Sequence, residues 1–368
     1  MSVVDTPYYG REQTLVKHKM LKRYLGAAAR IIGSRYRGFV YVDCCSGPWK
    51  SATDDLSDTS FSIALDELRT AREFLRKHGH NVEFRCLFAE RDGGAFRQLQ
   101  RFCDSISDIE IRLLPGDFTE KTNDILQFIH ARPGSFPFFF IDPTGWSPLA
   151  ITKIEPLLRT TPSEVLINFM TSHIKRFLES SDFEVKFGPD YMQKIMGQTG
   201  QDRDDLAAYS FADEIRKFYA YTSTSVVLNP LRDQTHFHLI YGTRHPKGIE
   251  KFKEAEKSCF GFMEAVRLDA QHRRAPDDEQ GVLFELTPTE DKYLQKLRRH
   301  YLTQALEVVT SENKRKQLDD EEAWKVASRF PLVWKTDIRA WLDASRPRPA
   351  ASQGKSPEGR ILKPSNMA

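Results

Sequence analysis

Four acidic residues stand directly behind four short apolar runs of the sequence. The runs FVYV, EFRCLFA, IEIRLL and PFFFI are followed within a few residues by Asp43, Glu90, Asp117 and Asp142. A short apolar run bounded by turn residues predicts a strand buried on both faces, and the carboxyl ends of parallel strands share the sheet edge where ligands bind. We therefore expect the four carboxylates to meet at one edge, although each would also suit a helix cap or a turn.

The segment YVDCCSGPWKS, around the first acid, suits a nucleotide-like ligand. Gly47 lets the backbone approach a ligand closely, Glu90 can accept hydrogen bonds from ribose hydroxyls, and Asp117 can accept one from an adenine amino group while Phe118 packs on the ring. The sequence contains neither a P-loop lysine motif nor GxGxxG, so we expect S-adenosylmethionine in preference to a phosphate-anchored ligand. The expected cofactor-binding residues are Asp43, Ser46, Gly47, Glu90, Asp117 and Phe118.

The segment FFFIDPTGWS carries the residues that we expect to act on a methyl acceptor. Asp142 and Pro143 match the start of the Asp-Pro-Pro-aromatic motif of amino-methyltransferases, in which the acid accepts a hydrogen bond from an exocyclic amine. Trp146 stands one position later than the motif's aromatic residue; it would stack on a flipped base or, equally, pack in the core. Methyl transfer depends on positioning more than on a strong base, so no catalytic dyad is needed.

The elements that must position these residues alternate between strand and helix. We expect strands at 39–42, 83–89, 109–114, 137–141 and 164–169, and helices at 14–33, 61–78, 92–104, 119–130 and 148–159. This alternation predicts a parallel, doubly wound sheet. The runs 224–229 and 236–243 are joined by a connection too short for a crossover helix, so we expect an antiparallel hairpin. Seven such strands are the inventory of the Rossmann-like methyltransferases, and the fold class is α/β.

The second half of the chain adds three further parts. We expect a Rossmann-like domain over 1–270 with a helical insertion at about 171–222, a linker at 271–281, and a winged helix-turn-helix domain over 282–368. In its third helix we expect Thr336 as the N-cap and Ile338, Trp341 and Leu342 as the inner face. The residues expected to contact DNA are Trp146, Lys335, Thr336, Arg339 and Arg346.

Charge and composition limit the remaining classes of function. The net charge is only +3, but residues 281–368 hold 16 Lys/Arg against 12 Asp/Glu, a local net of +4 that leaves about −1 for the rest. Such a distribution favours nucleic-acid binding at the C-terminal end, although an acidic stretch there also suits protein contacts. The five cysteines contain no CxxC pair, and we expect reduced thiols, a cytoplasmic location, no membrane partner and no metal.

The motifs LVKHKMLKRYL, YVDCCSGPW, FFFIDPTGW, LINF and HLIYGTRHPKG together resemble the three-Cys-motif partner proteins, called TcmP. The resemblance covers most of the chain and implies a methyltransferase-type Rossmann fold, a winged-helix tail and a radical-type partner protein with a three-cysteine motif. It also places Lys17 and His18 near the pocket mouth, whereas the alternative is a solvent-exposed lysine and a packed histidine. The loop departs from the family pattern at Cys44, Cys45, Ser46 and Trp49, where only Gly47 of the usual glycines remains.

Three functions fit these observations. The first is an S-adenosylmethionine-dependent methyltransferase acting on nucleic acid, which we expect to be double-stranded DNA, with Asp142, Pro143 and Lys17 at the reacting centre. The second is a non-catalytic protein that binds DNA and recruits the three-Cys-motif enzyme. The third is a processing or repair enzyme that only shares the fold, because a fold alone does not settle a reaction.

Overall fold

The structure of the chain is a computed structural model that describes residues 8–48, 51, 53–143, 149–171, 195–274 and 290–345. Several expectations from the sequence lie outside these residues. They are the positions of Trp49, Trp146 and Arg346, residues 172–194 of the expected insertion, most of the expected linker and the expected wing.

A seven-stranded sheet with the order β3-β2-β1-β4-β5-β7-β6 forms the centre of the molecule. Strands β1 to β5 are parallel, whereas β7 pairs antiparallel with both β5 and β6. This is the Rossmann-like arrangement of the class I methyltransferases, as the sequence predicted. The strands are β1 (Gly38–Asp43), β2 (Glu83–Glu90), β3 (Glu110–Pro115), β4 (Ser135–Ile141), β5 (Glu164–Phe169), β6 (Tyr221–Leu228) and β7 (Thr235–Thr243).

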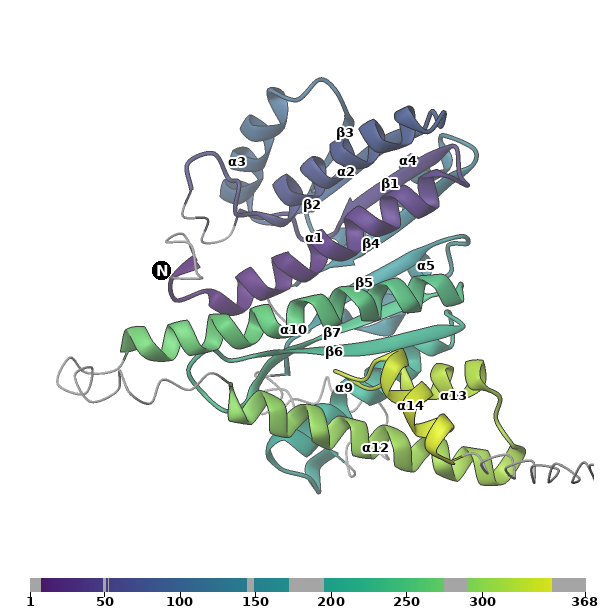
Figure 1. Cartoon of the computed structure of the whole chain (residues 1–368). Helices are drawn as coiled ribbons and strands as arrows, with labels where there is room; N and C mark the ends of the chain where they lie inside the picture. The colour runs from purple at the N-terminus through teal and green to yellow at the C-terminus, as the bar shows by residue number, and fades with distance from the viewer. Residues whose placement is uncertain are drawn as a thin grey trace, which may run out of the picture.

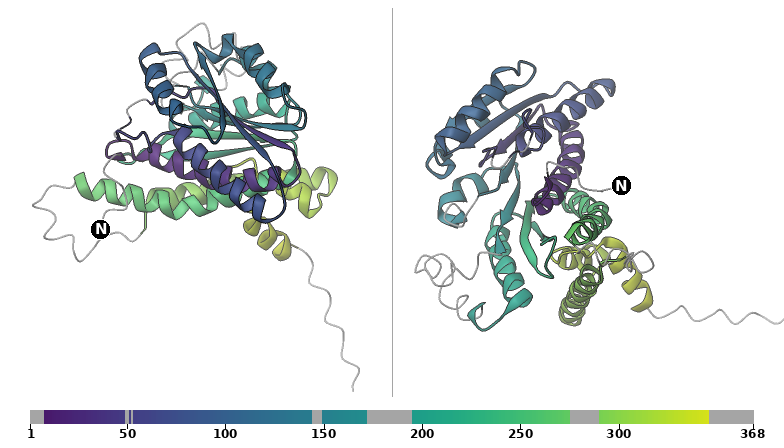
Figure 2. Two further views of the ribbon diagram at one scale, coloured as in Figure 1. Left: turned by 90° about the horizontal axis from the view of Figure 1, so that it is seen from above. Right: turned by 90° about the vertical axis from the view of Figure 1, so that its left-hand side faces the viewer.

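Helices cover both faces of the sheet (Figures 1 and 2). One face carries α1 (Glu12–Gly33), α2 (Ser60–Lys77), α3 (Gly93–Asp104) and α10 (Pro246–Arg274). The other carries α4 (Thr122–His130), α5 (Ile151–Leu158) and α9 (Gly200–Arg216), with the short 3-10 helix η2 (Phe118–Glu120) before α4. The C-terminal helices are α12 (Lys292–Lys316), α13 (Asp320–Ala327) and α14 (Lys335–Ser345). No described helix is both long enough and apolar enough to span a bilayer.

Strand β4 shows why an unbroken apolar run in the sequence predicts a strand of this sheet. Successive side chains of a strand point to opposite faces. Phe138 and Phe140 therefore pack in the core under α1, while Phe139 and Ile141 pack in the core under α4 and α5. All four are fully buried. A strand that is covered on both faces needs an unbroken apolar run, and the polar residue that follows it marks the end of the strand.

The structure also corrects two boundaries. Helix α10 continues through Arg274, so residues 271–274 are helical and do not belong to the expected linker. Helix α14 begins at Lys335, so Thr336 is not its N-cap. Instead, the Asp337 carboxylate accepts a hydrogen bond from the Trp334 backbone N–H at 2.9 Å, which closes the first turn. The expected inner face of this helix is present, since Ile338 is buried.

The C-terminal helices are docked onto the open edge of the sheet. Strand β6 is the last in the order, so its outer backbone groups need partners. The Thr224 N–H donates to the Arg329 carbonyl at 3.1 Å, and the Ser223 hydroxyl donates to the Ser328 carbonyl at 2.6 Å. The segment between α13 and α14 therefore covers this edge. Side chains of α12, α13 and α14 belong to the same apolar core as α1 and α10.

A buried arginine fixes the start of α12. Arg267 on α10 is 1% exposed and forms an ion pair with Asp291, whose other oxygen caps α12 by accepting from the Tyr293 and Leu294 N–H groups at 3.0 and 3.1 Å. Its guanidinium also donates to carbonyls in the turn between β6 and β7. One side chain thus joins α10, the β6–β7 turn and the C-terminal helices.

We predict that Arg267→Met lowers the free energy of unfolding by about 3–5 kcal/mol, because it leaves the buried Asp291 carboxylate and two partly buried carbonyls without their donor. Urea denaturation measures the change. The matched control is Arg273→Met on the same helix, which removes more exposed ion pairs with Asp269 and Glu12 and should cost about 1 kcal/mol or less. Equal costs for the two variants would contradict the assigned role of Arg267.

Candidate functional site

The four predicted acids lie at the same edge of the sheet. Asp43 ends β1, where it pairs with Phe88 of β2 and Phe140 of β4. Glu90 ends β2, Asp117 follows β3 by two residues, and Asp142 directly follows β4. Since these strands are parallel and adjacent, their carboxyl ends form one polar rim. The expectation that the acids gather there is confirmed.

Asp43 is fully buried and organises the loop that follows β1. Its carboxylate accepts hydrogen bonds from the Ser60 hydroxyl at 2.7 Å, the Cys45 N–H at 3.1 Å and the Tyr41 hydroxyl at 3.3 Å. Burial raises the pKa of Asp43 to about 6, against the effect of the bonds from Ser60 and Cys45, and the charge of Asp142 raises it further. Asp43 therefore acts through the loop that it holds, and it has no exposed surface to offer a ligand.

Gly47 brings the loop into close contact with Glu90. A Cβ added at Gly47 would collide with the Glu90 carboxylate and would lie 3.6 Å from the Ala95 Cβ, so only glycine fits without displacing Glu90. Ser46 beside it is buried and donates to the Asp43 carbonyl at 2.9 Å. One Glu90 oxygen accepts from the Asp92 N–H at 2.7 Å, whereas its other oxygen has no partner among the described residues.

Asp117 and Phe118 take partly different roles from those expected. One Asp117 oxygen caps η2 by accepting from the Thr119 N–H and hydroxyl at 2.9 and 2.8 Å, as the alternative of a helix cap predicted. The second oxygen has no partner within the described part of the chain. Phe118 is only 2% exposed and packs in the core under α4, so its ring does not present an open stacking surface.

Lys17, Asp142 and Asn168 form a polar cluster at the ends of β4 and β5. The Lys17 ammonium on α1 forms an ion pair with one Asp142 oxygen, and the Asn168 amide donates to the other at 2.6 Å. Lys17 is 8% exposed and its ammonium lies 5.8 Å from the centre of the Phe237 ring. The structure thus joins two residues that the sequence placed 125 positions apart. Pro143, next to them, is buried.

His18 is packed in the protein interior, as expected if it has no role at the pocket mouth. It is 6% exposed, and its Nδ1 shares a hydrogen bond of 3.2 Å with the Tyr8 hydroxyl. Burial and the neighbouring Lys17 ammonium lower the pKa of His18 to about 3, so the ring is neutral at ordinary pH. Its role is to pack α1 against the start of the described chain.

Asn168 and Ser60 are site residues that the sequence reasoning did not single out. Asn168 is 3% exposed, and its side-chain oxygen is buried without a partner in the described structure. The only sign of it in the sequence is that it is a polar residue inside the apolar run EVLINF. A buried amide needs hydrogen-bond partners, so its position between two apolar residues indicates a specific polar contact. Ser60 follows the N-cap Thr59 of α2, and no spacing rule connects it with Asp43.

A second buried polar network joins the end of β5 to α12. His238 of β7 is fully buried; its Nε2 lies 3.0 Å from an Asp205 oxygen, and its Nδ1 lies 3.4 Å from the Thr171 hydroxyl. The same Asp205 oxygen accepts from the Tyr301 hydroxyl of α12 at 2.9 Å. Among the described residues no group of three or more His, Cys, Asp or Glu side chains is arranged to bind a metal.

The residues expected to contact DNA on α14 are only partly free to do so. The Lys335 side chain is 35% exposed, but its ammonium is already paired with Glu250 at 2.6 Å and with Glu321 at 2.9 Å. The Thr336 hydroxyl lies 3.4 Å from the Lys257 ammonium of α10. Arg339 is exposed. The first turn of α14, which a recognition helix would place in the groove, thus packs against α10.

Comparison with known proteins gives weak structural likenesses. No family model matches the sequence, and no curated protein does. Solved structures that align with the chain include a protein of Porphyromonas gingivalis W83 assigned as a methyltransferase (12% identity, 60% of this chain and 41% of that one, TM-score 0.28). Others are human methyltransferase-like protein 13 in complex with SAH (11%, 72% and 95%, 0.31) and loganic acid methyltransferase with SAH (9%, 77% and 92%, 0.31). These scores are too low to carry an argument, so the fold assignment rests on the strand order.

Asp43 gives the site a pH-dependent stability that can be measured. Its pKa in the folded state, about 6, lies above the ordinary 3.8, so the folded protein holds this proton more tightly than the unfolded chain does. The free energy of unfolding should therefore fall by about 3 kcal/mol as pH rises from about 4 to about 7. Asp43→Asn should remove this fall in urea denaturation at several pH values. The exposed Asp104→Asn is the control, and a wild-type-like profile for Asp43→Asn would contradict the prediction.

Proposed function

We propose that this protein is an S-adenosylmethionine-dependent methyltransferase that acts on nucleic acid. One observation carries the cofactor assignment: Glu90 and Asp117, at the ends of neighbouring strands, each keep one carboxylate oxygen without a partner in the described structure. Two free acceptors beside a loop that only glycine fits suit the hydroxyl and amino donors of a nucleoside. The loop position of Gly47 and the buried Asp43 that holds this loop support the same ligand.

The cofactor, when bound, supplies an electrophilic methyl group. The task of this chain is to bind the acceptor and hold it in line. Lys17 and Asn168 fix the orientation of Asp142, and each of its oxygens retains a further lone pair. That carboxylate can accept a hydrogen bond from an exocyclic amino group. The bond would orient the lone pair of the nitrogen toward the methyl group.

Nucleic acid is proposed as the substrate on two grounds. The Asp142–Pro143 pair has the form found in enzymes that methylate the amino groups of bases, and the excess positive charge of the chain lies in residues 281–368. We place double-stranded DNA first. The resemblance to the three-Cys-motif partner proteins adds the proposal that a radical-type protein with a three-cysteine motif works together with this chain.

The second candidate is a non-catalytic partner that binds DNA and recruits the three-Cys-motif enzyme. The observation that favours it is that both Asp142 oxygens already have partners within the chain. An acceptor must then use the remaining lone pairs or displace Lys17. The two candidates differ in whether Asp142 is needed for a chemical step or only for the fold.

The first prediction concerns the cofactor. Calorimetric titration with S-adenosylmethionine should give micromolar affinity for the wild type and a loss of about 10- to 100-fold for Glu90→Ala, the cost of hydrogen bonds to a charged group. The matched control is Glu83→Ala, at the opposite end of the same strand, which should bind like the wild type. A folded wild-type protein that shows no binding would overturn the cofactor proposal.

The second prediction concerns Asp142. Transfer of labelled methyl groups from the cofactor to DNA should fall at least about 100-fold in Asp142→Ala, while the affinity for S-adenosylmethionine changes less than about threefold. Circular dichroism and urea denaturation check that the variant is folded. Undiminished transfer by the variant would exclude Asp142 from the reaction. Cofactor binding by the wild type without any transfer to DNA or RNA would favour the non-catalytic partner.

A further inference from the structure

The outer face of α12 carries the positive charge of the C-terminal helices. Residues Lys292 to Lys316 include seven Lys/Arg and two Asp/Glu, a net of +5 from seven minus two. The inner face is apolar and buried: Leu294, Leu297, Tyr301, Ala305 and Val309 belong to the main core. At 100° per residue, Lys292, Lys296, Arg299 and Lys314 lie together on the side opposite to this core.

These four cations have no ion pair within the described structure. Lys292, Lys296, Arg299 and Lys314 are all exposed, and none of them pairs with a described acid. The other basic residues of α12 differ, since Arg298 pairs with Asp337 and Arg315 pairs with Glu312. Unpaired cations on one face produce a positive potential that an external anion can use.

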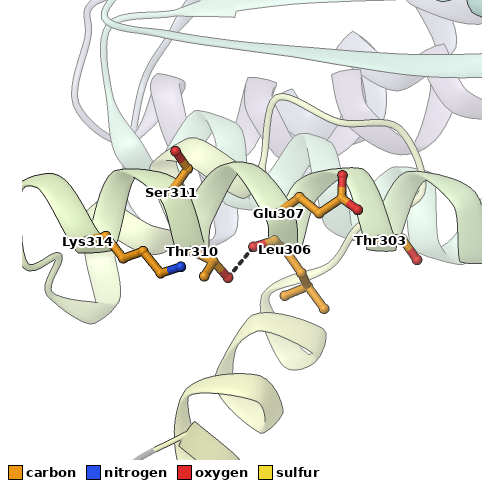
Figure 3. Close-up of a pocket in the computed structure, with 6 residues that line it drawn as sticks. All are labelled: Thr303, Leu306, Glu307, Thr310, Ser311 and Lys314. Carbon is orange, nitrogen blue, oxygen red and sulfur yellow. Dashed lines mark hydrogen bonds between the residues drawn. The ribbon is translucent and has the colours of Figure 1, made fainter.

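An open hollow lies on the C-terminal half of this cationic face and includes Lys314. It is lined by Thr303, Leu306, Glu307, Thr310, Ser311 and Lys314, all on α12 (Figure 3). The two threonine hydroxyls donate to carbonyls of their own helix, Thr303 to Arg299 and Thr310 to Leu306. The Ser311 hydroxyl has no partner among the described residues and can donate outward. Hydroxyls and cations are the side chains that contact a phosphodiester backbone.

The spacing of the cations fits one turn of a duplex. Lys292 and Lys314 are 22 residues apart, which corresponds to about 33 Å along the helix at 1.5 Å per residue. One helical turn of B-DNA is about 34–36 Å. A straight helix laid along the duplex therefore meets phosphates at both ends.

We propose that the outer face of α12, not the first turn of α14, docks the backbone of double-stranded DNA; this rests on the proposed function and names where its substrate binds. Lys335 of α14 is neutralised by Glu250 and Glu321. Such a surface contacts phosphates and reads no base, so its affinity depends strongly on salt and little on sequence.

Other anionic partners fit this face less well. Single-stranded nucleic acid is bound by stacking bases on aromatic side chains, and the only large apolar side chain exposed on α12 is Val308. A membrane-surface helix inserts its apolar face into the lipid, whereas the apolar face of α12 is buried in the core.

The beginning of α12, at Lys292, lies on the side of the molecule that carries the candidate site. Helices α1 and α12 both begin at the left in Figure 1. A chain of contacts leads from α12 to the end of β5, since Tyr301 bonds to Asp205, Asp205 to His238, and His238 to Thr171. DNA held by Lys292, Lys296 and Arg299 is thereby docked on an element that is fixed to the end of β5, the strand that carries Asn168.

The test compares two triple variants of the full chain by fluorescence anisotropy with a labelled 20-base-pair DNA duplex. The first is Lys292→Gln/Lys296→Gln/Arg299→Gln. The control is Arg76→Gln/Lys77→Gln/Arg101→Gln, which removes the same charge from exposed residues of α2 and α3. We expect the first to weaken binding at least tenfold and to reduce the slope of log K against log salt by about 2.7, which is 0.9 for each lost phosphate contact. The control should bind like the wild type.

Two outcomes would overturn the proposal. One is wild-type binding by the α12 variant together with a loss in Lys335→Gln/Arg339→Gln, which would return the duplex to α14. The other is that the wild type binds single-stranded RNA or vesicles containing phosphatidylserine through these residues more tightly than the duplex. Titration of each variant with S-adenosylmethionine separates the cofactor proposal from the docking proposal. If the α12 variant binds both the cofactor and the duplex like the wild type, only the docking face is contradicted.

Discussion

The Asp142 carboxylate, just after β4, is poorly hydrated, so its negative charge must be balanced by groups of the protein. This requirement determines how the site is assembled. The Asp142 side chain is 18% exposed, and a charge so poorly hydrated needs an ion pair and hydrogen bonds. Lys17 supplies the charge from α1, and Asn168 supplies a hydrogen bond from β5. The ion pair therefore fixes the position of α1 along the sheet. His18, the next residue, packs against Tyr8 and remains neutral.

The same requirement holds the C-terminal helices in place. Arg267 is buried with Asp291, and Lys253 is buried with Glu256; all four are at most 5% exposed. Lys253 also donates to the Phe330 carbonyl at 2.7 Å, and Glu256 accepts from the Leu332 N–H at 3.0 Å. Because breaking a buried pair is costly, the helices behave as part of the main core. The chain is thus connected by more than the linker, and the orientation of α12 relative to the strands is fixed.

Sequence reasoning succeeded where one local pattern determined one local structure. The run PFFFI could only be a strand covered on both faces, and the short PLRDQT connection could only join antiparallel strands. The acids at strand ends followed from the same rule. Asn168 was harder, since its partner Asp142 becomes its neighbour only through the pairing of β4 with β5. Ser60 reaches Asp43 across 17 residues, a contact that no periodicity encodes.

The C-terminal charge shows a second limit of sequence reasoning. The excess of Lys and Arg was countable, but the count could not say which cations the fold itself neutralises. Lys335 belongs to a helix with the outline of a recognition helix, yet Glu250, 85 residues earlier, pairs with it. Lys292 and Lys296 belong to the first helix of the expected motif, which supports the recognition helix, and they are exposed and have no ion pair within the described structure. Which residues meet an anion is decided by pairing in three dimensions.

The contrast between the free and the occupied carboxylates suggests how binding and chemistry are connected. Glu90 and Asp117 each offer an oxygen at once, whereas both oxygens of Asp142 already have partners. When a neutral amino group displaces Lys17, the Asp142 carboxylate loses a hydrogen bond from a charged donor, which is worth about 1.5–3 kcal/mol. Contacts far from the reacting atoms can supply that energy. The phosphate contacts that we propose along α12 would be of this kind, and an acceptor presented on a long duplex would then reach Asp142 more readily than a free base.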